Sequence, residues 1–182
     1  MKTLEPKEEF VQAAQKGDIS YIQRHIDQVS EKIKIKAFVY TASVEISQLL
    51  QVHGINIDAK DKGEEGFSVY SYMWTYPALA VSCKENYTER ALWLIQQGAN
   101  VNACWSVMFA NGIKYCLTPL MWSVKNKNLL LIQSLITAQA DVNYLGYDDD
   151  ANRATAFSLA KKYPPKEYTE ITNLLKSAGA KE

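Results

Sequence analysis

LTPLMWSVKNKNLLLIQSLITAQADVN, at residues 117–143, is the stretch of sequence that decides the fold. Thr118 can cap a helix with its side chain, and Pro119 suits the first helical position, where its missing N–H costs nothing. A second helix is predicted after a short polar break, because apolar residues recur there at three- and four-residue steps. These residues are Leu129, Ile132, Leu135 and Ile136. The stretch therefore predicts two consecutive helices that end in a short extended turn.

The end of this stretch has two similar copies elsewhere in the chain. QADVNY at residues 139–144 resembles HGINIDA at 53–59 and QGANVNA at 97–103. Gly54 and Gly98 follow apolar stripes and suit a left-handed stop at the end of a helix. Similar text at intervals of tens of residues indicates stacked repeats, each burying its hydrophobic face against its neighbours.

The repeated phrase and the helix pairs around it resemble the ankyrin repeat, whose signature begins Thr-Pro-Leu. The match is clearest at Thr118-Pro119-Leu120 and weaker at Pro77-Ala78-Leu79. The resemblance implies an all-α solenoid of about five ankyrin-like helix pairs with β-hairpin loops, two of them extended. It also implies one ankyrin repeat domain over residues 1–182, with units at approximately 5–30, 31–60, 61–103, 104–143 and 144–180. Arrays of this kind present an extended binding surface rather than a catalytic pocket.

The composition indicates a soluble globular protein with no strong preference for charged partners. Lysine plus arginine and aspartate plus glutamate both number 20, and 47% of the residues are hydrophobic. We therefore expect no nucleic-acid partner and no membrane partner. The chain begins MKTLEPKEEF, which lacks the apolar core of a signal peptide, so a cytoplasmic location is expected.

The cysteines and the overall residue usage also bear on the location of the protein. Cys83, Cys104 and Cys116 are odd in number and lack zinc-type spacing, which suggests free thiols in a reducing compartment. The Lys-, Ile-, Asn- and Tyr-rich text also resembles ankyrin proteins of intracellular bacteria. Some of those proteins are exported, and an exported effector would act in the host cytosol.

Two insertions between the helix pairs are predicted to form β-hairpins. In the second, Asn111-Gly112 is a two-residue turn signal between WSVMFA and IKYCL. That turn would pair Met108 with Tyr115 and would place Cys116 opposite Val107. A disulfide between the two hairpin cysteines would then require a register slip.

The first insertion carries an aromatic strand after a turn at residues 63–66. In FSVYSYMWTY, the alternation of a strand places four aromatic residues on one face: Tyr70, Tyr72, Trp74 and Tyr76. Such residues suit a half-buried site that binds a partner. The alternative is that the two hairpins pack on each other and bury this face.

We predict a non-catalytic protein–protein interaction module that binds across the hairpin tips and the concave inner-helix face. Lysines on that face favour a protein partner with an acidic patch. The chain is expected to be a monomer, with a dimer through exposed hairpin edges as the alternative. The expected binding residues are Tyr70, Tyr72, Trp74, Tyr76, Ile113, Lys114, Tyr115, Lys84 and Lys125.

The sequence offers little for catalysis, so we expect no enzyme, no cofactor and no metal site. His25 and His53 lie near predicted helix ends, where a structural role is the simplest interpretation. The run Asp148-Asp149-Asp150 lacks the glycine and distant glutamate of a calcium loop. The alternative hypothesis is a small enzyme or enzyme regulator that uses Cys116 or Cys83 in a pocket between the hairpins.

Overall fold

The computed structural model describes residues 6–65, 72–109, 114–148, 150, 152–162 and 165–181. Within these residues the α-helices are α1 (Pro6–Lys16), α2 (Ile19–His25), α3 (Glu31–Tyr40), α4 (Val44–Val52), α5 (Ala78–Lys84), α6 (Thr88–Gln96), α7 (Pro119–Lys125), α8 (Leu129–Thr137), α9 (Ala156–Lys161) and α10 (Pro165–Ser177). A short 3-10 helix, η1 (Ile26–Gln28), follows α2. The strands are β1 (Lys60–Glu65), β2 (Tyr72–Pro77), β3 (Trp105–Phe109), β4 (Lys114–Leu117), β5 (Gly146–Tyr147) and β6 (Arg153–Ala154).

The strands form one six-stranded antiparallel sheet in the order β1-β2-β3-β4-β5-β6. The expected all-α solenoid of ankyrin-like repeats is therefore wrong, because the fold combines helices with a continuous sheet. Treating the hairpins as separate loops overlooked the pairing of β2 with β3 and of β4 with β5. Strand N–H and C=O groups left at a hairpin edge need partners, and the adjacent hairpin supplies them.

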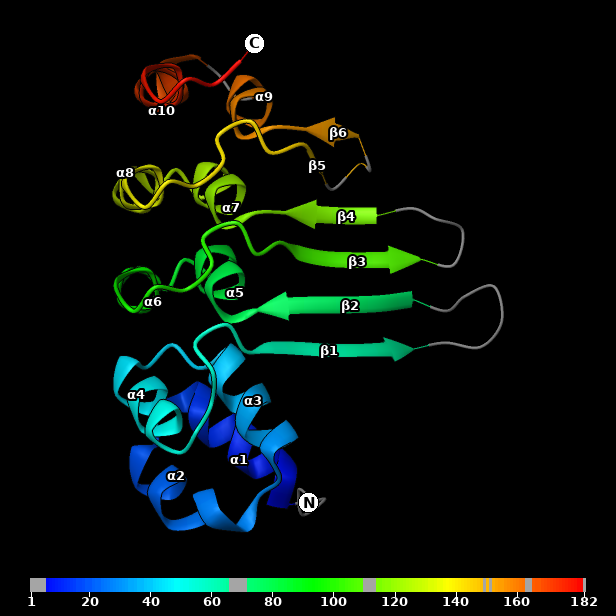
Figure 1. The fold of residues 1–182 in the computed structure, drawn as a ribbon, viewed down its shortest axis with the longest axis vertical. Coiled ribbons are helices and arrows are strands. Elements are labelled where there is room, and N and C mark those ends of the chain that lie inside the picture. The colour runs from blue at the N-terminus through cyan, green and yellow to red at the C-terminus, as the bar shows by residue number, and fades with distance from the viewer. Residues whose placement is uncertain are drawn as a thin grey trace.

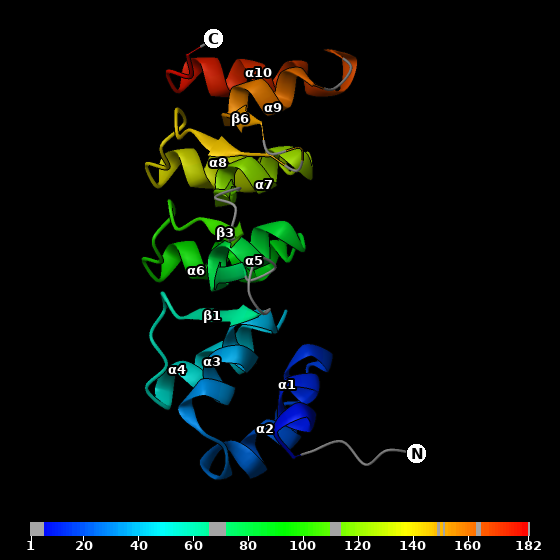
Figure 2. The same ribbon diagram turned by 90° about the vertical axis from the view of Figure 1, so that its right-hand side faces the viewer.

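The helices form two rows beside this sheet (Figure 1). In one row, next to the sheet, α1, α3, α5, α7 and α9 contact one another in sequence order. In the other row, α2, α4, α6, α8 and α10 do the same. Figure 2 shows the helix pairs stacked along the long axis, with the two ends of the chain at opposite ends of the molecule.

The local helix signals of the sequence are confirmed. The Thr118 side chain accepts a hydrogen bond from the Met121 N–H at 3.3 Å, and Pro119 occupies the first turn of α7. Gly54 and Gly98 end α4 and α6 with φ angles of 89° and 81°. Gln139 takes the corresponding place after α8 at φ 63°, although it carries a side chain. These signals were predictable because each depends on residues within one turn of helix.

The repeated Asn-Val-Asn phrase links each unit to the next by hydrogen bonds. The Asp58 carboxylate accepts from the Asn100 N–H at 2.7 Å, and the Asn102 side chain accepts from the Asp141 N–H at 2.8 Å. Asn143 accepts in the same way from the C-terminal segment. The polar residues of the phrase therefore hold successive units in register, while apolar side chains between the two helix rows form the core.

The register of the β3–β4 hairpin differs from the predicted one by one residue. Val107 pairs with Tyr115 and Met108 with Lys114, so Cys116 lies opposite Ser106. The slip moves the side chains of β4 to the opposite faces of the sheet. The turn at residues 110–113 lies outside the described residues. Contacts of β3 with β2 and of β4 with α7 outweigh the local turn signal here.

Candidate functional site

Four aromatic side chains from three elements stack in a row, and we call this row the aromatic ladder. It consists of Trp74 and Tyr76 on β2, Trp105 on β3 and Trp122 on α7. The ring centroids of Trp74 and Tyr76 are 6.3 Å apart, and those of Tyr76 and Trp105 are 5.0 Å apart at an interplanar angle of 7°. Trp105 then meets Trp122 edge to face at 5.6 Å. The ladder crosses from the sheet to the inner row of helices.

Strand alternation and the sheet register place the ladder rings on one face. Residues 74 and 76 point the same way along β2, and the pairing of Trp74 with Val107 puts Trp105 on that face as well. Gly63 of β1 lies opposite Trp74 and leaves room for its indole. A Cβ atom added at Gly63 would lie 2.2 Å from Cζ2 of Trp74. The ring is therefore seated directly on the β1 backbone.

Two lysines lie against the α7 end of the ladder. Nζ of Lys84 lies 5.8 Å from the ring centroids of both Trp105 and Trp122. Nζ of Lys125 lies 4.7 Å from the Trp122 centroid. Both are cation–π contacts, which stabilise an ammonium group at an aromatic face. Lys84 also forms an ion pair with Glu85 at 2.5 Å, but both side chains are partly exposed, so this pair contributes little stability.

Trp122 carries a polar atom that the fold does not satisfy. Its side chain is 8% exposed, and within the described part of the chain its indole N–H has no hydrogen-bond partner. A buried donor without an acceptor typically costs about 1–3 kcal/mol, so most native structures avoid it. The ring that carries this group is the one that contacts Trp105 and both lysines.

A tyrosine–aspartate pair fixes β1 at the other end of this face. The Tyr40 hydroxyl on α3 donates to the Asp61 carboxylate at 2.9 Å, and Asp61 pairs with Tyr76 across the strands. Burial raises the pKa of Tyr40 well above its ordinary value, and the charge of Asp61 and the hydrogen bond to it act in the same direction. Tyr40 therefore remains a neutral donor and holds α3 against β1.

The predicted binding residues are distributed unevenly around the ladder. Trp74, Tyr76, Lys84 and Lys125 come together in it. Tyr115 lies on the same sheet face, opposite Val107. Tyr72 and Lys114 lie at strand ends where only the backbone is described, and Tyr70 and Ile113 lie outside the described residues.

Sequence reasoning missed two members of the ladder. Trp105 is not among the expected binding residues, because the sequence does not show that β2 pairs with β3. Trp122 lies just after the Thr-Pro-Leu signature and is also not among the expected binding residues. Its place three residues before Lys125, at one helical turn, is the signal that could have found it. The rings of Trp74, Tyr76 and Trp105 pack on one another and stay partly exposed, while partner binding stays a prediction.

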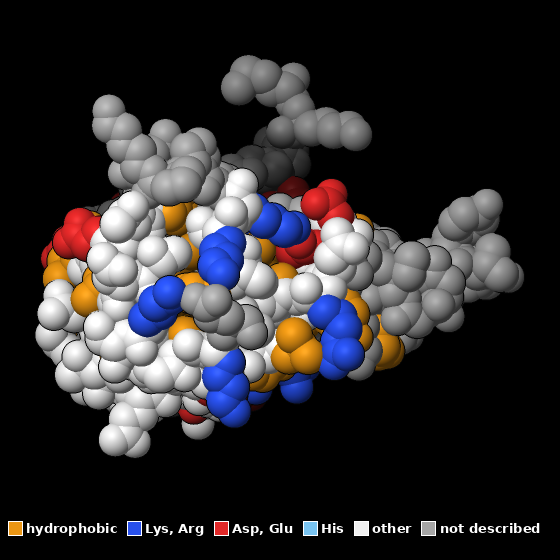
Figure 3. Space-filling view, turned by 90° about the horizontal axis from the view of Figure 1, so that it is seen from above, with side chains coloured by type: hydrophobic (Ala, Val, Ile, Leu, Met, Phe, Trp, Pro, Cys, Tyr) orange, Lys and Arg blue, Asp and Glu red, His pale blue; other side chains and the backbone are white. Residues whose placement is uncertain are grey.

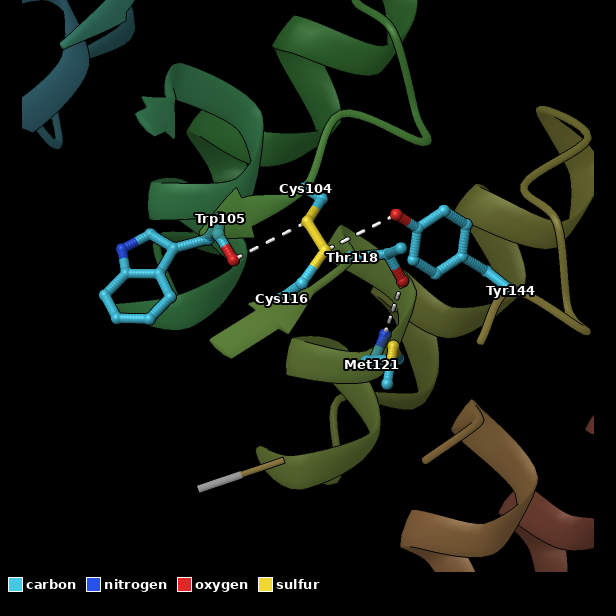
Figure 4. Close-up of a disulfide and its surroundings, with 6 residues drawn as sticks. All are labelled: Cys104, Trp105, Cys116, Thr118, Met121 and Tyr144. Carbon is cyan, nitrogen blue, oxygen red and sulfur yellow. Dashed lines mark hydrogen bonds between the residues drawn. A yellow bond between two sulfur atoms is a disulfide. The ribbon is translucent and has the colours of Figure 1, made fainter. Parts of the chain in front are cut away.

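The thiol chemistry expected from the sequence requires correction. Cys104 and Cys116 form a disulfide with a Cα–Cα distance of 5.8 Å, where free thiols were expected. Figure 4 shows this disulfide between Trp105 and Tyr144, whose hydroxyl lies 3.4 Å from Sγ of Cys116. Cys83 is fully buried, and burial raises the pKa of its thiol to about 12 despite an opposing hydrogen bond with Ser123.

The described residues that line the hollow between the strands include neither Cys116 nor Cys83, which the enzyme alternative requires. A hollow of about 420 Å³ lies against β1, β2 and β3, with Met73, Thr75, Ser106 and Met108 on its wall. The described residues around it include no cysteine, histidine or carboxylate. His25 and His53 are occupied elsewhere, because each ring Nδ1 lies within 3.0 Å of a carbonyl oxygen in its own helix.

The acidic loop after β5 is organised by one buried carboxylate. Asp148 accepts hydrogen bonds from the Lys162 ammonium and from the N–H groups of Asp150 and Asn152. Burial acts to raise the pKa of Asp148, but the hydrogen bond from Lys162 and those from the backbone outweigh it and lower the pKa. No group of three or more potential metal ligands occurs among the residues that the structure describes.

Seen from its C-terminal end, the molecule shows lysine and arginine side chains interspersed with hydrophobic ones (Figure 3). Local basic surface can therefore occur on a chain whose total formal charge is zero. Among the described helices, none is both long enough and apolar enough to cross a membrane.

Comparison with known proteins does not identify a family. No protein-family model matches the chain, and no curated protein matches it.

Proposed function

We propose that this chain is a non-catalytic protein-binding module whose partner lies across the aromatic ladder and the adjoining inner helices. The observation that supports the proposal is the ladder itself. Its rings on the sheet are preformed and partly exposed, and the row ends at the buried Trp122 of α7, where two lysines lie against it.

The physical properties of the ladder suit recognition. Tryptophan and tyrosine provide large contact areas and dominate the energetics of many interfaces. Because each ring is already held by its neighbours, binding would immobilise few side chains and would cost little conformational entropy. Lys84 and Lys125 favour an acidic partner surface and would speed its association.

The cysteine-dependent alternative receives no support from the described residues. Cys116 is held in a disulfide, and Cys83 has neither exposure nor an accessible thiolate. The disulfide also removes the thiol argument for a reducing compartment. The cytoplasmic and host-cytosol locations remain predictions that rest on the N-terminal sequence and on the residue usage.

Replacing Trp105 by Ala tests the proposed function. The variant removes the ring that joins Tyr76 to Trp122, so we expect partner affinity to fall at least about thirtyfold, as for an interface hot spot. The partner would first be captured from a source lysate with the wild-type chain, purified, and its affinity for each variant measured by calorimetry.

Leu130→Ala is the matched control, because Leu130 is an exposed apolar residue on the outer helix α8. It should leave affinity unchanged, and far-UV circular dichroism should show that both variants are folded. Equal loss of affinity in the two variants, or none in Trp105→Ala, would contradict a ladder-centred site.

A further inference from the structure

We propose that the α7 end of the aromatic ladder binds the carboxylate of an acidic side chain of the partner protein. The carboxylate would accept a hydrogen bond from the indole N–H of Trp122 and would pair with the ammonium groups of Lys84 and Lys125. This inference rests on the proposed function, and it names the chemical group that the site recognises.

The first observation is the unpaired donor. The Trp122 indole N–H is buried and has no acceptor within the described residues, whereas the rings around it are well packed. Replacing the polar group with an apolar one would remove the problem, yet the chain retains an indole here. A donor that is unsatisfied in the free protein and satisfied in the complex favours binding, because the cost of burying it already exists before association.

The second observation is the pair of cations at the same indole. Lys84 and Lys125 come from different helices, α5 and α7, and both place Nζ against the Trp122 ring. Both ammonium groups lie within 6 Å of the centre of one ring, so an anion beside that ring is attracted by both. Lys84 can leave Glu85 at low cost, because their ion pair is partly exposed.

A carboxylate meets all three requirements together. It has two oxygens with about four lone pairs, so it can accept from an indole N–H and two ammonium groups at once. A neutral amide could satisfy the indole but would not form an ion pair with either ammonium group. A basic side chain would be repelled. The stacked rings of Trp105 and Tyr76 beside the cations provide apolar contact for residues that flank the acidic one.

The lysine side chains lie over the ring of Trp122 in the free protein. With Nζ of Lys125 4.7 Å from the Trp122 centroid, the lysines contribute to the cover over this ring in the free protein. We infer that they move from the indole onto the arriving carboxylate, which exposes the N–H to the same acceptor. Long, flexible lysine side chains allow this movement without a change in the backbone.

The test uses the full chain, labelled with ¹⁵N, and two blocked peptides. N-acetyl-Phe-Glu-Phe-amide carries one side-chain carboxylate as its sole anion, and N-acetyl-Phe-Gln-Phe-amide is its neutral counterpart. NMR titration of the tryptophan indole N–H signals reports on each ring separately. We expect the glutamate peptide to shift the Trp122 signal downfield and to bind at least about tenfold more tightly than the glutamine peptide. The preference should decrease as ionic strength rises.

Variants assign this preference to the proposed groups. Lys84→Met and Lys125→Met keep side-chain length but remove charge, and each should reduce the glutamate preference severalfold. Lys36→Met, at an exposed site on α3, should leave it unchanged. Trp122→Phe keeps an aromatic ring without an N–H donor and should also reduce the preference.

The outcomes separate the two proposals. Equal binding of both peptides, with shifts at Trp74 and Trp105, would overturn the carboxylate inference and leave the ladder as the binding surface. If no peptide moves the Trp122 signal in the wild type, the carboxylate inference fails. If neither peptide affects any ladder indole, while a purified partner binds Trp105→Ala as well as wild type, both proposals fail.

Discussion

Cys83 shows how the environment of one side chain decides its chemistry. It lies within α5, is fully buried, and accordingly has a thiol pKa raised to about 12. In the unfolded chain the thiol would titrate near its ordinary value of about 8.5. The folded state therefore keeps a proton between these two pH values that the unfolded state loses.

This difference predicts that the protein loses stability at alkaline pH through Cys83. Ionisation of Cys83 does not change the unfolding free energy below about pH 8.5. Above that pH it lowers the unfolding free energy by about 1.4 kcal/mol per pH unit as the pH rises toward 12. A Cys83→Ala variant lacks this loss. It should be less stable than wild type at pH 7, because the substitution leaves a small cavity. This difference in unfolding free energy should fall to zero and change sign by about pH 10.

Urea unfolding of both proteins at pH 7, 8.5, 9.5 and 10.5 would measure this difference directly. Comparing the two curves cancels the titration of all other groups. A difference that stays constant across this range would show that Cys83 does not titrate differently in the folded state.

At the scale of elements, the sheet is stabilised by contacts between strands that are distant in sequence. The fit of Trp74 over Gly63 joins β1 to β2, and the Tyr76–Trp105 stack joins β2 to β3. The edge strand β1 reads KDKGEE, and its charges oppose edge-to-edge pairing with another sheet. The monomer therefore stays a prediction, with a dimer through hairpin edges as the alternative.

Gly63→Ala should displace the ring of Trp74, the first ring of the aromatic ladder. The new methyl group would meet the Trp74 ring at 2.2 Å, so the ring must move, at a cost of about 1–3 kcal/mol in unfolding free energy. We expect a weaker near-ultraviolet circular dichroism signal and a lower denaturation midpoint. In a Trp74→Ala background the same glycine change should cost much less. An equal cost in both backgrounds would mean that the indole is not the obstacle.

Part of the element structure was predictable from the sequence, and part was not. The cap at Thr118, the stop at Gly98 and the helical stripes depend on residues close in the chain. The β3–β4 register and the Cys104–Cys116 disulfide depend on strands and helices packed around the hairpin. Turn chemistry alone predicted the wrong partner for Cys116, because it contained no information about those neighbours.

At the scale of the whole molecule, Arg90 joins successive helix pairs. This fully buried side chain on α6 donates to the hydroxyls of Ser47 on α4 and Ser82 on α5, and to the carbonyl oxygens of Phe38 and Val39 on α3. Burial lowers the pKa of Arg90 to about 9, while the nearby Tyr87 acts in the opposite direction. The guanidinium thereby connects the pair α3 and α4 to the pair α5 and α6.

Arg90→Ala should destabilise the whole molecule. Several buried acceptors would lose their donor and a large cavity would form, so we expect the unfolding free energy to fall by about 3 kcal/mol or more. Arg24→Ala is the control, because Arg24 is exposed and bonds only within its own helix among the described contacts. Its effect should stay within about 0.5 kcal/mol in urea unfolding. Similar effects of the two changes would argue against Arg90 as a connector.

The sequence by itself determined where helices begin and end, which phrase repeats, and which aromatic and lysine residues were candidates for binding. These properties follow from capping, periodicity and backbone conformation, which act over a few residues. Only the tertiary structure decided that the hairpins form one sheet, that β4 has its observed register, and that Trp105 and Trp122 complete the ladder. Those features depend on strand edges and side chains from distant segments finding partners, and a local pattern does not specify which partners they find.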